Sequence, residues 1–417
     1  MRPRTIAAIV AIFIISSGVI GGYAITQAFG TQGTLAEVWV TDTARSSDLG
    51  NHHAPIAEQI RGDPLIITPV NSQVDQTSCA LVAFNGSNNN LTRMWQDGLP
   101  YEDCNIHSFG DPTIADVDGD GKQEVLVATT EDIVLAYNTT SGEEEFRRQL
   151  AGWGYSAPIV TDFTSAEGRE LIVADLEGGV FVFRQNGTTA WKQKLDGGVY
   201  ARPIVDDFDT DGVSELIVGY GGDEVLMFEP NGTIAWRTET EGTPAWITTG
   251  NADGDKAPEI VAATTDGNVH ALDSQDGSVM WTQGFGDLAA VHAFGDGDQD
   301  NQTEVYAVAE DGKLRALDAS DGSIEWTTTL TTEDVQMMPP PGMADLDSDD
   351  DPELVAMSYD GSVSIINPQT GGTITSYERD VPLWMRPTFA DVDGDGSQEI
   401  LVVYGDGRVV ALSYNEK

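Results

Sequence analysis

A landmark recurs along almost the whole chain at a spacing of about 45 residues. Short acidic segments begin at Asp116, Asp162, Asp207, Asn251, Asp296, Asp345 and Asp391. One aromatic residue per unit keeps the same spacing, at Trp95, Phe146, Trp191, Trp236, Trp281, Trp326 and Tyr377. Two interleaved series with one period indicate a repeat protein, in which similar units pack side by side.

Each unit predicts four short β-strands. In one unit, residues 215–219 are an apolar run, as expected of a strand that is buried on both faces. Residues 224–228 supply the next strand, and the turn at Asn231-Gly232 leads to the last strand, which carries Trp236. Four-stranded units without helical periodicity predict an all-β fold, a β-propeller in which the Trp residues pack between neighbouring blades.

The predicted number of blades is eight. The last unit has three strands and lacks the fourth, and residues 35–41 resemble that missing strand, with Trp39 in the aromatic position. Residues 53–59, 64–68 and 79–84 then supply strands of a first blade. The propeller would occupy residues 31–417, and its N-terminal strand would close the last blade and remove exposed sheet edges. Seven blades remain the alternative if the N-terminal region packs otherwise.

The first 30 residues predict a membrane anchor or a signal peptide. Arg2 and Arg4 precede an apolar run from Ile6 to Ile25 that is long enough to cross a bilayer. The basic flank predicts a cytoplasmic N-terminus, so the propeller would lie outside the cell on a single-pass anchor. Cleavage of the segment would give a secreted protein instead.

Charge and cysteine usage constrain the surroundings of the protein. Its 21 Lys and Arg stand against 68 Asp and Glu, a formal net charge of −47, which repels nucleic acid. Such acidity suits a protein that works in concentrated salt, where charge repulsion is screened. Cys79 and Cys104 fit a disulfide in an oxidising location, with two free thiols as the alternative. Asn-x-Ser/Thr acceptor motifs for glycans occur at Asn85, Asn90, Asn138, Asn186, Asn231 and Asn301.

The acidic segments have the composition of calcium loops. Asp116, Asp118, Asp120 and Glu124 place oxygen ligands at positions 1, 3, 5 and 9, and Gly121 at position 6 permits a sharp turn. Six copies keep all four ligand positions. The other five are Asp207, Asp209, Asp211 and Glu215; Asn251, Asp253, Asp255 and Glu259; Asp296, Asp298, Asp300 and Glu304; Asp345, Asp347, Asp349 and Glu353; and Asp391, Asp393, Asp395 and Glu399.

Not every copy is expected to bind a cation. The copies that begin at Asn251, Asp296 and Asp345 lack the Gly at position 6. The copy at Asp162 has Thr164 and Ala166 at ligand positions and is expected to be empty. A structural Ca²⁺ role is predicted for the six intact loops, meaning those that keep all four ligand positions, with or without the Gly. Each cation would link adjacent strands of one blade. The alternative is that the loops are only acidic turns.

These loops, each followed by a buried strand, resemble those of the FG-GAP, or integrin-α-type, propellers. The turn that ends in Trp281, with the sequence ALDSQDGSVMW, and the matching turn that ends in Trp326 resemble those of PQQ-like propeller repeats. The resemblance covers nearly all of the chain after about residue 37 and, with the acidity, is of haloarchaeal type. It implies a propeller and bound calcium, but no single function.

The axial mouth of the propeller is the place where a ligand site is expected. Residues just before the first strand of each unit should surround it: His52, His53, His107, Tyr155, Tyr200, Trp246, His292, Met338, Trp384 and Arg386. A group of imidazoles and a thioether suits a borderline metal. An aromatic, polar channel entrance is the simpler interpretation.

Two functions fit these observations. The first is a calcium-stabilised binding or scaffold module at the cell surface, with a protein or glycan partner. The alternative is a PQQ-dependent oxidoreductase or another enzyme with an axial site. PQQ is not expected, because the chain has no vicinal Cys pair and no Asp that stands apart from the loop aspartates.

Overall fold

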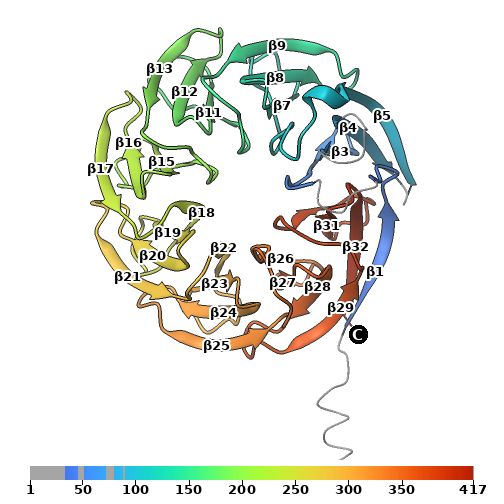
Figure 1. The fold of residues 1–417 in the computed structure, drawn as a ribbon, viewed down its shortest axis with the longest axis vertical. Coiled ribbons are helices and arrows are strands. Elements are labelled where there is room, and N and C mark those ends of the chain that lie inside the picture. Colours follow the sequence, from blue (N-terminus) through green and yellow to red (C-terminus); the bar gives the residue numbers. More distant parts are fainter. Residues whose placement is uncertain (1–32, 46–50, 72–78, 88–89, 417) are drawn as a thin grey trace, which may run out of the picture.

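The computed structural model describes residues 33–45, 51–71, 79–87 and 90–416. They form eight antiparallel sheets of four strands each, arranged as blades around a central axis (Figure 1). The predicted eight-bladed propeller is confirmed, and the seven-bladed alternative is excluded.

The first four blades follow the chain from the centre outwards. Blade 1 has β2 (Ile56–Ile60), β3 (Asp63–Val70), β4 (Cys79–Ser87) and β5 (Asn90–Leu99). The short 3-10 helix η1 (Tyr101–Asp103) leads to blade 2, with β6 (Thr113–Ala115), β7 (Glu124–Ala128), β8 (Ile133–Asn138) and β9 (Glu144–Gln149). Blade 3 has β10 (Ile159–Thr161), β11 (Glu170–Ala174), β12 (Gly179–Arg184) and β13 (Thr189–Lys194). Blade 4 has β14 (Ile204–Asp206), β15 (Glu215–Tyr220), β16 (Glu224–Phe228) and β17 (Ile234–Glu239).

The remaining blades repeat this order until the last. Blade 5 has β18 (Pro244–Gly250), β19 (Glu259–Thr264), β20 (Asn268–Leu272) and β21 (Val279–Gly284). Blade 6 has β22 (Ala289–Gly295), β23 (Glu304–Ala309), β24 (Lys313–Asp318) and β25 (Ile324–Thr329). Blade 7 has β26 (Gly342–Ala344), β27 (Glu353–Met357), β28 (Ser362–Ile366) and β29 (Thr373–Glu378). Blade 8 combines β30 (Thr388–Ala390), β31 (Glu399–Val403) and β32 (Val409–Glu416) with β1 (Gly33–Val40) from the N-terminal end.

The ring closes through β1. This strand pairs antiparallel with β32, with Leu35 opposite Tyr414 and Trp39 opposite Ala411. In Figure 1 the blue β1 lies on the outside of the red blade 8. The predicted closure is confirmed, and it leaves the last blade with the same four strands as the others.

The hydrophobic core lies between the blades. All five residues of β7 and all five of β11 are buried, as their apolar runs predicted. Val125 and Val127 of blade 2 pack in one cluster with Ile67 and Leu81 of blade 1. Full burial of one such side chain contributes roughly 1.5–3 kcal/mol, so each interface adds to the stability of both blades.

A recurrent β-bulge directs the outer aromatic residues. In blade 5, Ala271 pairs with Trp281 but Leu272 pairs with Val279, so one residue of β21 is left out of register. The same shift occurs beside Trp236 and Trp326. A bulge bends its strand and re-aims a side chain. In these three blades the bulge comes directly before the Trp residue, and this Trp contacts the next blade.

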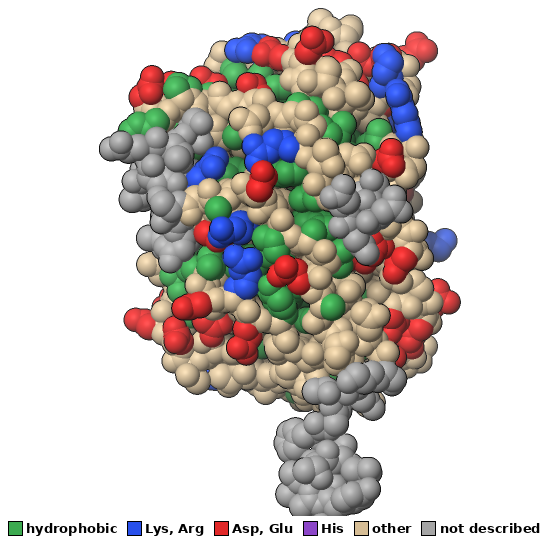
Figure 2. Space-filling model, turned by 90° about the vertical axis from the view of Figure 1, so that its right-hand side faces the viewer, with side chains coloured by type: hydrophobic (Ala, Val, Ile, Leu, Met, Phe, Trp, Pro, Cys, Tyr) green, Lys and Arg blue, Asp and Glu red, His purple; other side chains and the backbone are tan. Residues whose placement is uncertain are grey.

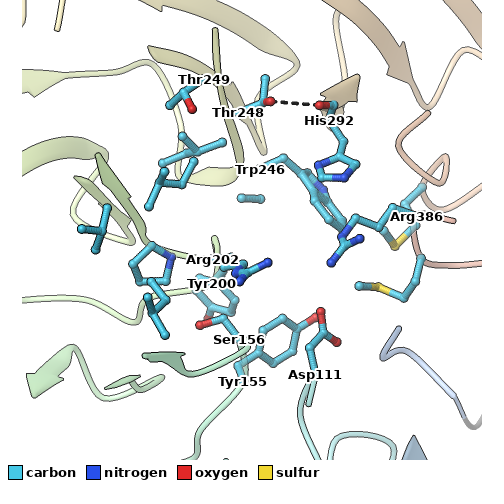
Figure 3. A pocket seen from close by; sticks show the side chains of 18 of the residues that line it. Asp111, Tyr155, Ser156, Tyr200, Arg202, Trp246, Thr248, Thr249, His292 and Arg386 are labelled. Atoms are coloured by element: carbon cyan, nitrogen blue, oxygen red, sulfur yellow. Dashed lines mark hydrogen bonds between the residues drawn. The ribbon is translucent and has the colours of Figure 1, made fainter. Parts of the chain in front are cut away.

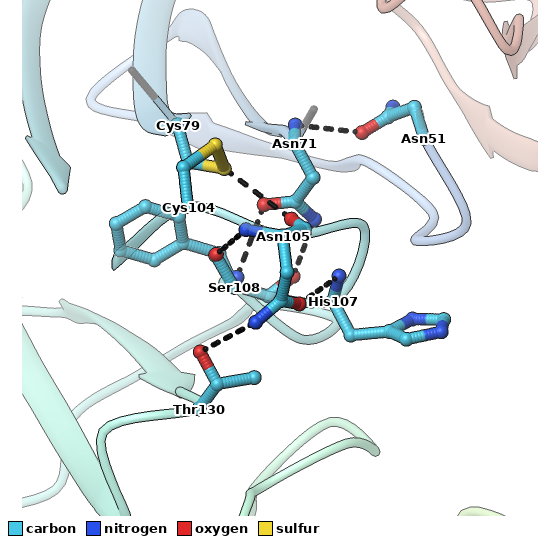
Figure 4. The surroundings of a disulfide bond; sticks show 9 residues. Asn51, Asn71, Cys79, Cys104, Asn105, His107, Ser108 and Thr130 are labelled. Carbon is cyan, nitrogen blue, oxygen red and sulfur yellow. Dashed lines mark hydrogen bonds between the residues drawn. A yellow bond between two sulfur atoms is a disulfide. The ribbon is translucent and has the colours of Figure 1, made fainter. Parts of the chain in front are cut away.

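Blade 1 carries the one disulfide among the described residues, Cys79–Cys104, with its Cα atoms 5.3 Å apart (Figure 4). Beside it, the backbone N–H of Asn105 donates to Ser108 Oγ at 2.7 Å, and Asn71 Nδ2 donates to the carbonyl oxygen of Phe109 at 2.9 Å. The predicted disulfide is confirmed. It ties the start of β4 to the connection that leads into blade 2.

The predicted anchor at residues 1–30 lies outside the described residues. Within the part of the chain that the structure describes, no helix is long and apolar enough to cross a membrane. On the side of the propeller in Figure 2, Asp and Glu side chains lie at both the upper and the lower edge.

Candidate functional site

The glutamate at position 9 of each acidic loop is fixed in the same way. One of its carboxylate oxygens accepts a hydrogen bond from the backbone N–H of the residue at position 2. The seven pairs are Val117–Glu124 (3.0 Å), Phe163–Glu170 (3.0 Å), Phe208–Glu215 (2.9 Å), Ala252–Glu259 (2.5 Å), Gly297–Glu304 (3.1 Å), Leu346–Glu353 (2.7 Å) and Val392–Glu399 (2.8 Å). The glutamate opens the second strand of its blade, so the strand and the loop hold each other in place.

In six of the seven loops the Asp or Asn at position 1 closes the loop by accepting backbone N–H groups from later residues of the same loop. Asp116 accepts backbone N–H groups from Gly119 at 2.7 Å and from Gly121 at 3.1 Å. Gly121 has a φ of +84°, which requires the left-handed region. Asn301 and Asp350 occupy the same position in two loops that lack the Gly, with φ of +67° and +74°. Asn and Asp tolerate this region better than other side chains, which explains why the loop survives without Gly.

The loops bring most of their predicted ligands together. In the loop of blade 6, ligand oxygens of Asp296, Asp298, Asp300 and Glu304 all lie within 4.8 Å of one another. Four other loops each bring three acidic residues within that distance. They are Asp116, Asp118 and Glu124; Asp207, Asp209 and Glu215; Asp253, Asp255 and Glu259; and Asp345, Asp347 and Glu353.

The aspartate at position 5 is the member that most often stands apart. Asp120 does not join the oxygens of its own group and instead forms an ion pair with Lys122 Nζ at 2.5 Å. Asp211 and Asp349 each accept a backbone N–H group from the residue two positions later, Val213 at 2.8 Å and Asp351 at 2.9 Å. In the loop of blade 8, Asp391 accepts backbone N–H groups from Gly394 at 2.6 Å and Gly396 at 3.2 Å, as Asp116 does from its own loop.

The grouped carboxylates perturb one another. Burial, together with repulsion from the loop aspartates, raises the pKa of the position-9 glutamate to about 7 in five loops. These glutamates are Glu124, Glu215, Glu304, Glu353 and Glu399. Burial also raises the pKa of Glu259. Negative charge is therefore concentrated in these loops beyond what their own hydrogen bonds compensate.

The loop at Asp162 is built differently. Its Glu170 accepts hydrogen bonds from the backbone N–H groups of Phe163 and Thr164, each at 3.0 Å, and from Thr164 Oγ1 at 2.6 Å. A hydroxyl donor therefore stands where the other loops have a second acid. The Asp162 loop therefore offers fewer acidic ligands than the others, and that it is empty stays a prediction. Glu170 itself was not singled out from the sequence, although its spacing from Asp162 matches the other six loops.

The axis of the propeller holds a cavity of about 540 Å³ (Figure 3). Of the residues predicted to surround the axial mouth, five line this cavity: Tyr155, Tyr200, Trp246, His292 and Arg386. Asp111, Arg202 and Met385 also line it and were not predicted. Met338 instead lies in the core between blades 6 and 7, and its neighbour Met337 faces the cavity.

The other predicted residues form an aromatic group beside the cavity. His53 Nε2 lies 3.1 Å from His107 Nδ1, and the ring of His52 stacks on Trp384 with 4.4 Å between centroids. Tyr155 contacts both His53 and His107 and joins this group to the cavity. Burial, followed by the neighbouring imidazoles, lowers the pKa of His107 to about 3, so its ring is neutral.

No curated protein matches the chain in sequence. Solved structures share its fold. BamB from Moraxella catarrhalis is 16% identical, with a TM-score of 0.62 over 91% of this chain and 97% of that chain. The V. cholerae biofilm matrix protein Bap1 is 13% identical, with a TM-score of 0.68 over 93% and 91%. A europium-containing methanol dehydrogenase is 13% identical, with a TM-score of 0.65 over 90% and 85%.

A family model described as outer membrane protein assembly factor BamB matches residues 161–288 and 221–417. The two matches overlap and together extend over more than half of the chain. They begin within blade 3 and run to the closing blade, and they include the turns that carry Trp281 and Trp326. The chain therefore belongs to the BamB family of PQQ-like repeat propellers.

Proposed function

We propose that this chain is a binding or scaffold module at the cell surface, a propeller whose blades are stabilised by calcium. The observation that carries the proposal is the repeated loop in which a fixed glutamate and two or three aspartates converge. Membership in a family described as an assembly factor supports a scaffold role. The fold is also that of a protein named as a biofilm matrix component.

The loops fit a hard cation on their own chemistry. Asp207 Oδ1, Glu304 Oε1 and Asp347 Oδ1 are buried and have no hydrogen-bond partner in the described part of the chain. An unsatisfied buried carboxylate oxygen costs free energy, and Ca²⁺ takes several such oxygens as ligands. The residues that would hold it are those at positions 1, 3, 5 and 9 of the six intact loops, as in FG-GAP-type propellers. Bound there, the cation would neutralise the loop charge and fasten the loop to the second strand.

One pair of matched variants tests the loops. Glu304→Gln removes the charge from a loop with four acidic ligands but keeps an oxygen that can accept the bond from Gly297. Glu170→Gln makes the same change in the Asp162 loop. We expect the calcium content of purified E304Q to fall by one equivalent and that of E170Q to stay at the wild-type value. Full calcium content in E304Q would overturn the assignment of this loop.

Several properties of the chain support a location outside the cell. The Cys79–Cys104 disulfide suits an oxidising compartment. The apolar N-terminal segment would serve as the membrane anchor, or as a signal for secretion. The acceptor residues Asn231 and Asn301 are exposed, so glycans at these positions would not disturb the core. The net charge of −47 suits a halophilic, haloarchaeal setting in which salt screens self-repulsion.

Location and partner can be tested on intact cells. A membrane-impermeant amine reagent should label the full chain, because Lys192 and Lys194 lie on the outer strand β13. Crosslinking of whole cells should then join the propeller to a protein or glycan partner, and chelation of calcium should weaken that association. Protection of the chain from the reagent in intact cells, with labelling only after lysis, would overturn the extracellular location.

A quinoprotein oxidoreductase remains the second candidate. The specific observation in its favour is the axial cavity in a fold shared with a methanol dehydrogenase. Titration of the purified protein with PQQ separates the two functions. A change in the quinone spectrum and a dye-linked alcohol oxidation would favour the enzyme, and the absence of both would exclude it.

A further inference from the structure

Two arginine side chains face each other across the axial cavity. Arg202 comes from the connection before β14 and Arg386 from the connection before β30, so they belong to blades 4 and 8, on opposite sides of the ring. In Figure 3 both guanidinium groups point towards the middle of the cavity. Both also line a second space of about 420 Å³ along the axis, so they stand where the two spaces meet.

The charges of these two arginines are not compensated by an ion pair. Among the residues that the structure describes, neither guanidinium has a carboxylate oxygen within 4.0 Å. The Arg386 side chain donates a long hydrogen bond, from Nη1 to the carbonyl oxygen of Pro387 at 3.5 Å. In a chain with 68 acidic and 21 basic residues, two guanidiniums that line one cavity without an acidic partner require an explanation.

The charges of both arginines affect the pKa values of groups that line the cavity. Burial lowers the pKa of Arg202, and repulsion from Arg386 adds to that effect. Burial, followed by the charges of Arg386 and Arg202, lowers the pKa of His292 to about 3. The arginines keep their protons, since guanidinium does not deprotonate in proteins. The neutral imidazole of His292 therefore completes a group of nitrogen donors without adding a third charge.

The acidic residue among those that line the cavity is already engaged. Asp111 Oδ1 accepts hydrogen bonds from His53 Nδ1 at 2.9 Å and from the backbone N–H of Ala54 at 3.0 Å. Burial alone would raise the pKa of Asp111, but the bond from His53 and the charges of His53 and Arg386 lower it. Asp111 therefore offsets part of the positive charge at a distance and leaves the guanidinium donors available.

Most of the remaining wall is apolar. The side chains that line the cavity include Ile204, Trp246, Ile247, Met337 and Met385. A volume of about 540 Å³ is in the range of pockets that enclose small organic molecules. An apolar wall with two convergent guanidiniums suits a molecule with one anionic end and an apolar body. Planar carboxylates match the fork of donors that a guanidinium presents.

We propose that the axial cavity is a binding site for a small organic carboxylate, with Arg202 and Arg386 holding the carboxylate and the apolar wall enclosing the rest. This site does not depend on calcium in the loops or on the partner of the propeller. Its failure and the failure of the proposed function are therefore separate outcomes. The anion would also lower the electrostatic cost of keeping two like charges close together.

Benzoate and its neutral analogue benzamide test the site by calorimetric titration of the full chain with calcium present. We expect benzoate to bind. Benzamide should bind at least roughly tenfold more weakly, since a hydrogen bond to a charged group accounts for at least that factor. Arg202→Gln and Arg386→Gln should each weaken benzoate binding by a similar factor. Arg237→Gln, on the outer strand β17, removes an arginine far from the axis and should leave binding unchanged.

A second measurement keeps the proposal falsifiable if a variant folds poorly. Without ligand, R202Q should unfold at the same temperature as the wild type or at a higher one, because it relieves repulsion between two like charges that face one cavity. Equal binding of benzoate and benzamide to the wild type would overturn the proposal. So would the absence of benzoate binding, or unchanged binding in both R202Q and R386Q.

Discussion

The indole Nε1 of Trp281, in blade 5, donates a 2.7 Å hydrogen bond to the carbonyl oxygen of Ala319, in blade 6. The same contact to the following blade is made by four other tryptophans: Trp95 to Thr139, Trp191 to Pro230, Trp236 to Ser274 and Trp326 to Pro368. The aromatic residue that repeats in the sequence is therefore a link between successive blades. Phe146 and Tyr377 lack an indole N–H, and the indole Nε1 of Trp39, in the closing strand, has no hydrogen-bond partner among the described residues.

Replacing Trp281 by Phe should lower the free energy of unfolding by about 1–2 kcal/mol. The variant keeps an aromatic ring but leaves the carbonyl of Ala319 without its donor, and a lost hydrogen bond in a buried place costs about that much. Chemical denaturation measures the change. Trp153→Phe is the matched control, because Trp153 is 46% exposed. A W281F protein as stable as W153F would show that the indole bond adds nothing to the interface.

Replacing Gly322 by Ala should lower the free energy of unfolding by more than the same change at Gly62 does. Both glycines have positive φ, +72° and +91°, so both variants suffer the backbone strain of order 1–3 kcal/mol. A Cβ on Gly322 would also lie 2.6 Å from the ring of Trp281, whereas a Cβ on Gly62 would meet no atom within 4 Å. The difference between the two losses in denaturation free energy isolates the contact between ring and glycine. Equal losses would contradict it.

Replacing His292 by Gln should make stability less sensitive to acid. The folded state lowers the pKa of His292 from 6.5 to about 3, while the unfolded state keeps the ordinary value. The unfolded chain therefore binds a proton first, and stability falls as the pH drops below about 6.5. Arg202, Arg386 and Asp111 line the same cavity as His292, and none of them is changed in the variant.

Thermal unfolding of the wild type and H292Q at about pH 7 and about pH 5 measures this effect. The loss of melting temperature between the two pH values should be smaller in H292Q. An equal loss in both proteins would mean that the imidazole of His292 already titrates near its ordinary pKa in the folded state.

The repeat made the fold predictable and left the axial site only partly so. Interleaved acidic and aromatic series defined the blades, and Trp39 revealed the closing strand because it kept the aromatic position. The position-9 glutamates followed from loop spacing, but their bond to the position-2 N–H is a backbone feature that a sequence pattern does not display. Arg202 was missed because it stands in one unit alone and meets Arg386 only when the ring closes. Met338 was misplaced because adjacent residues in an extended segment face opposite sides.

The most direct test of the account is metal analysis of the desalted protein in high salt, together with thermal unfolding with and without a chelator. We predict five or six tightly bound calcium ions per chain and a large fall in melting temperature after chelation, because uncompensated carboxylates would then repel one another in every intact loop. A protein that contains no calcium, and whose melting temperature is unchanged by the chelator, would show that the loops are only acidic turns.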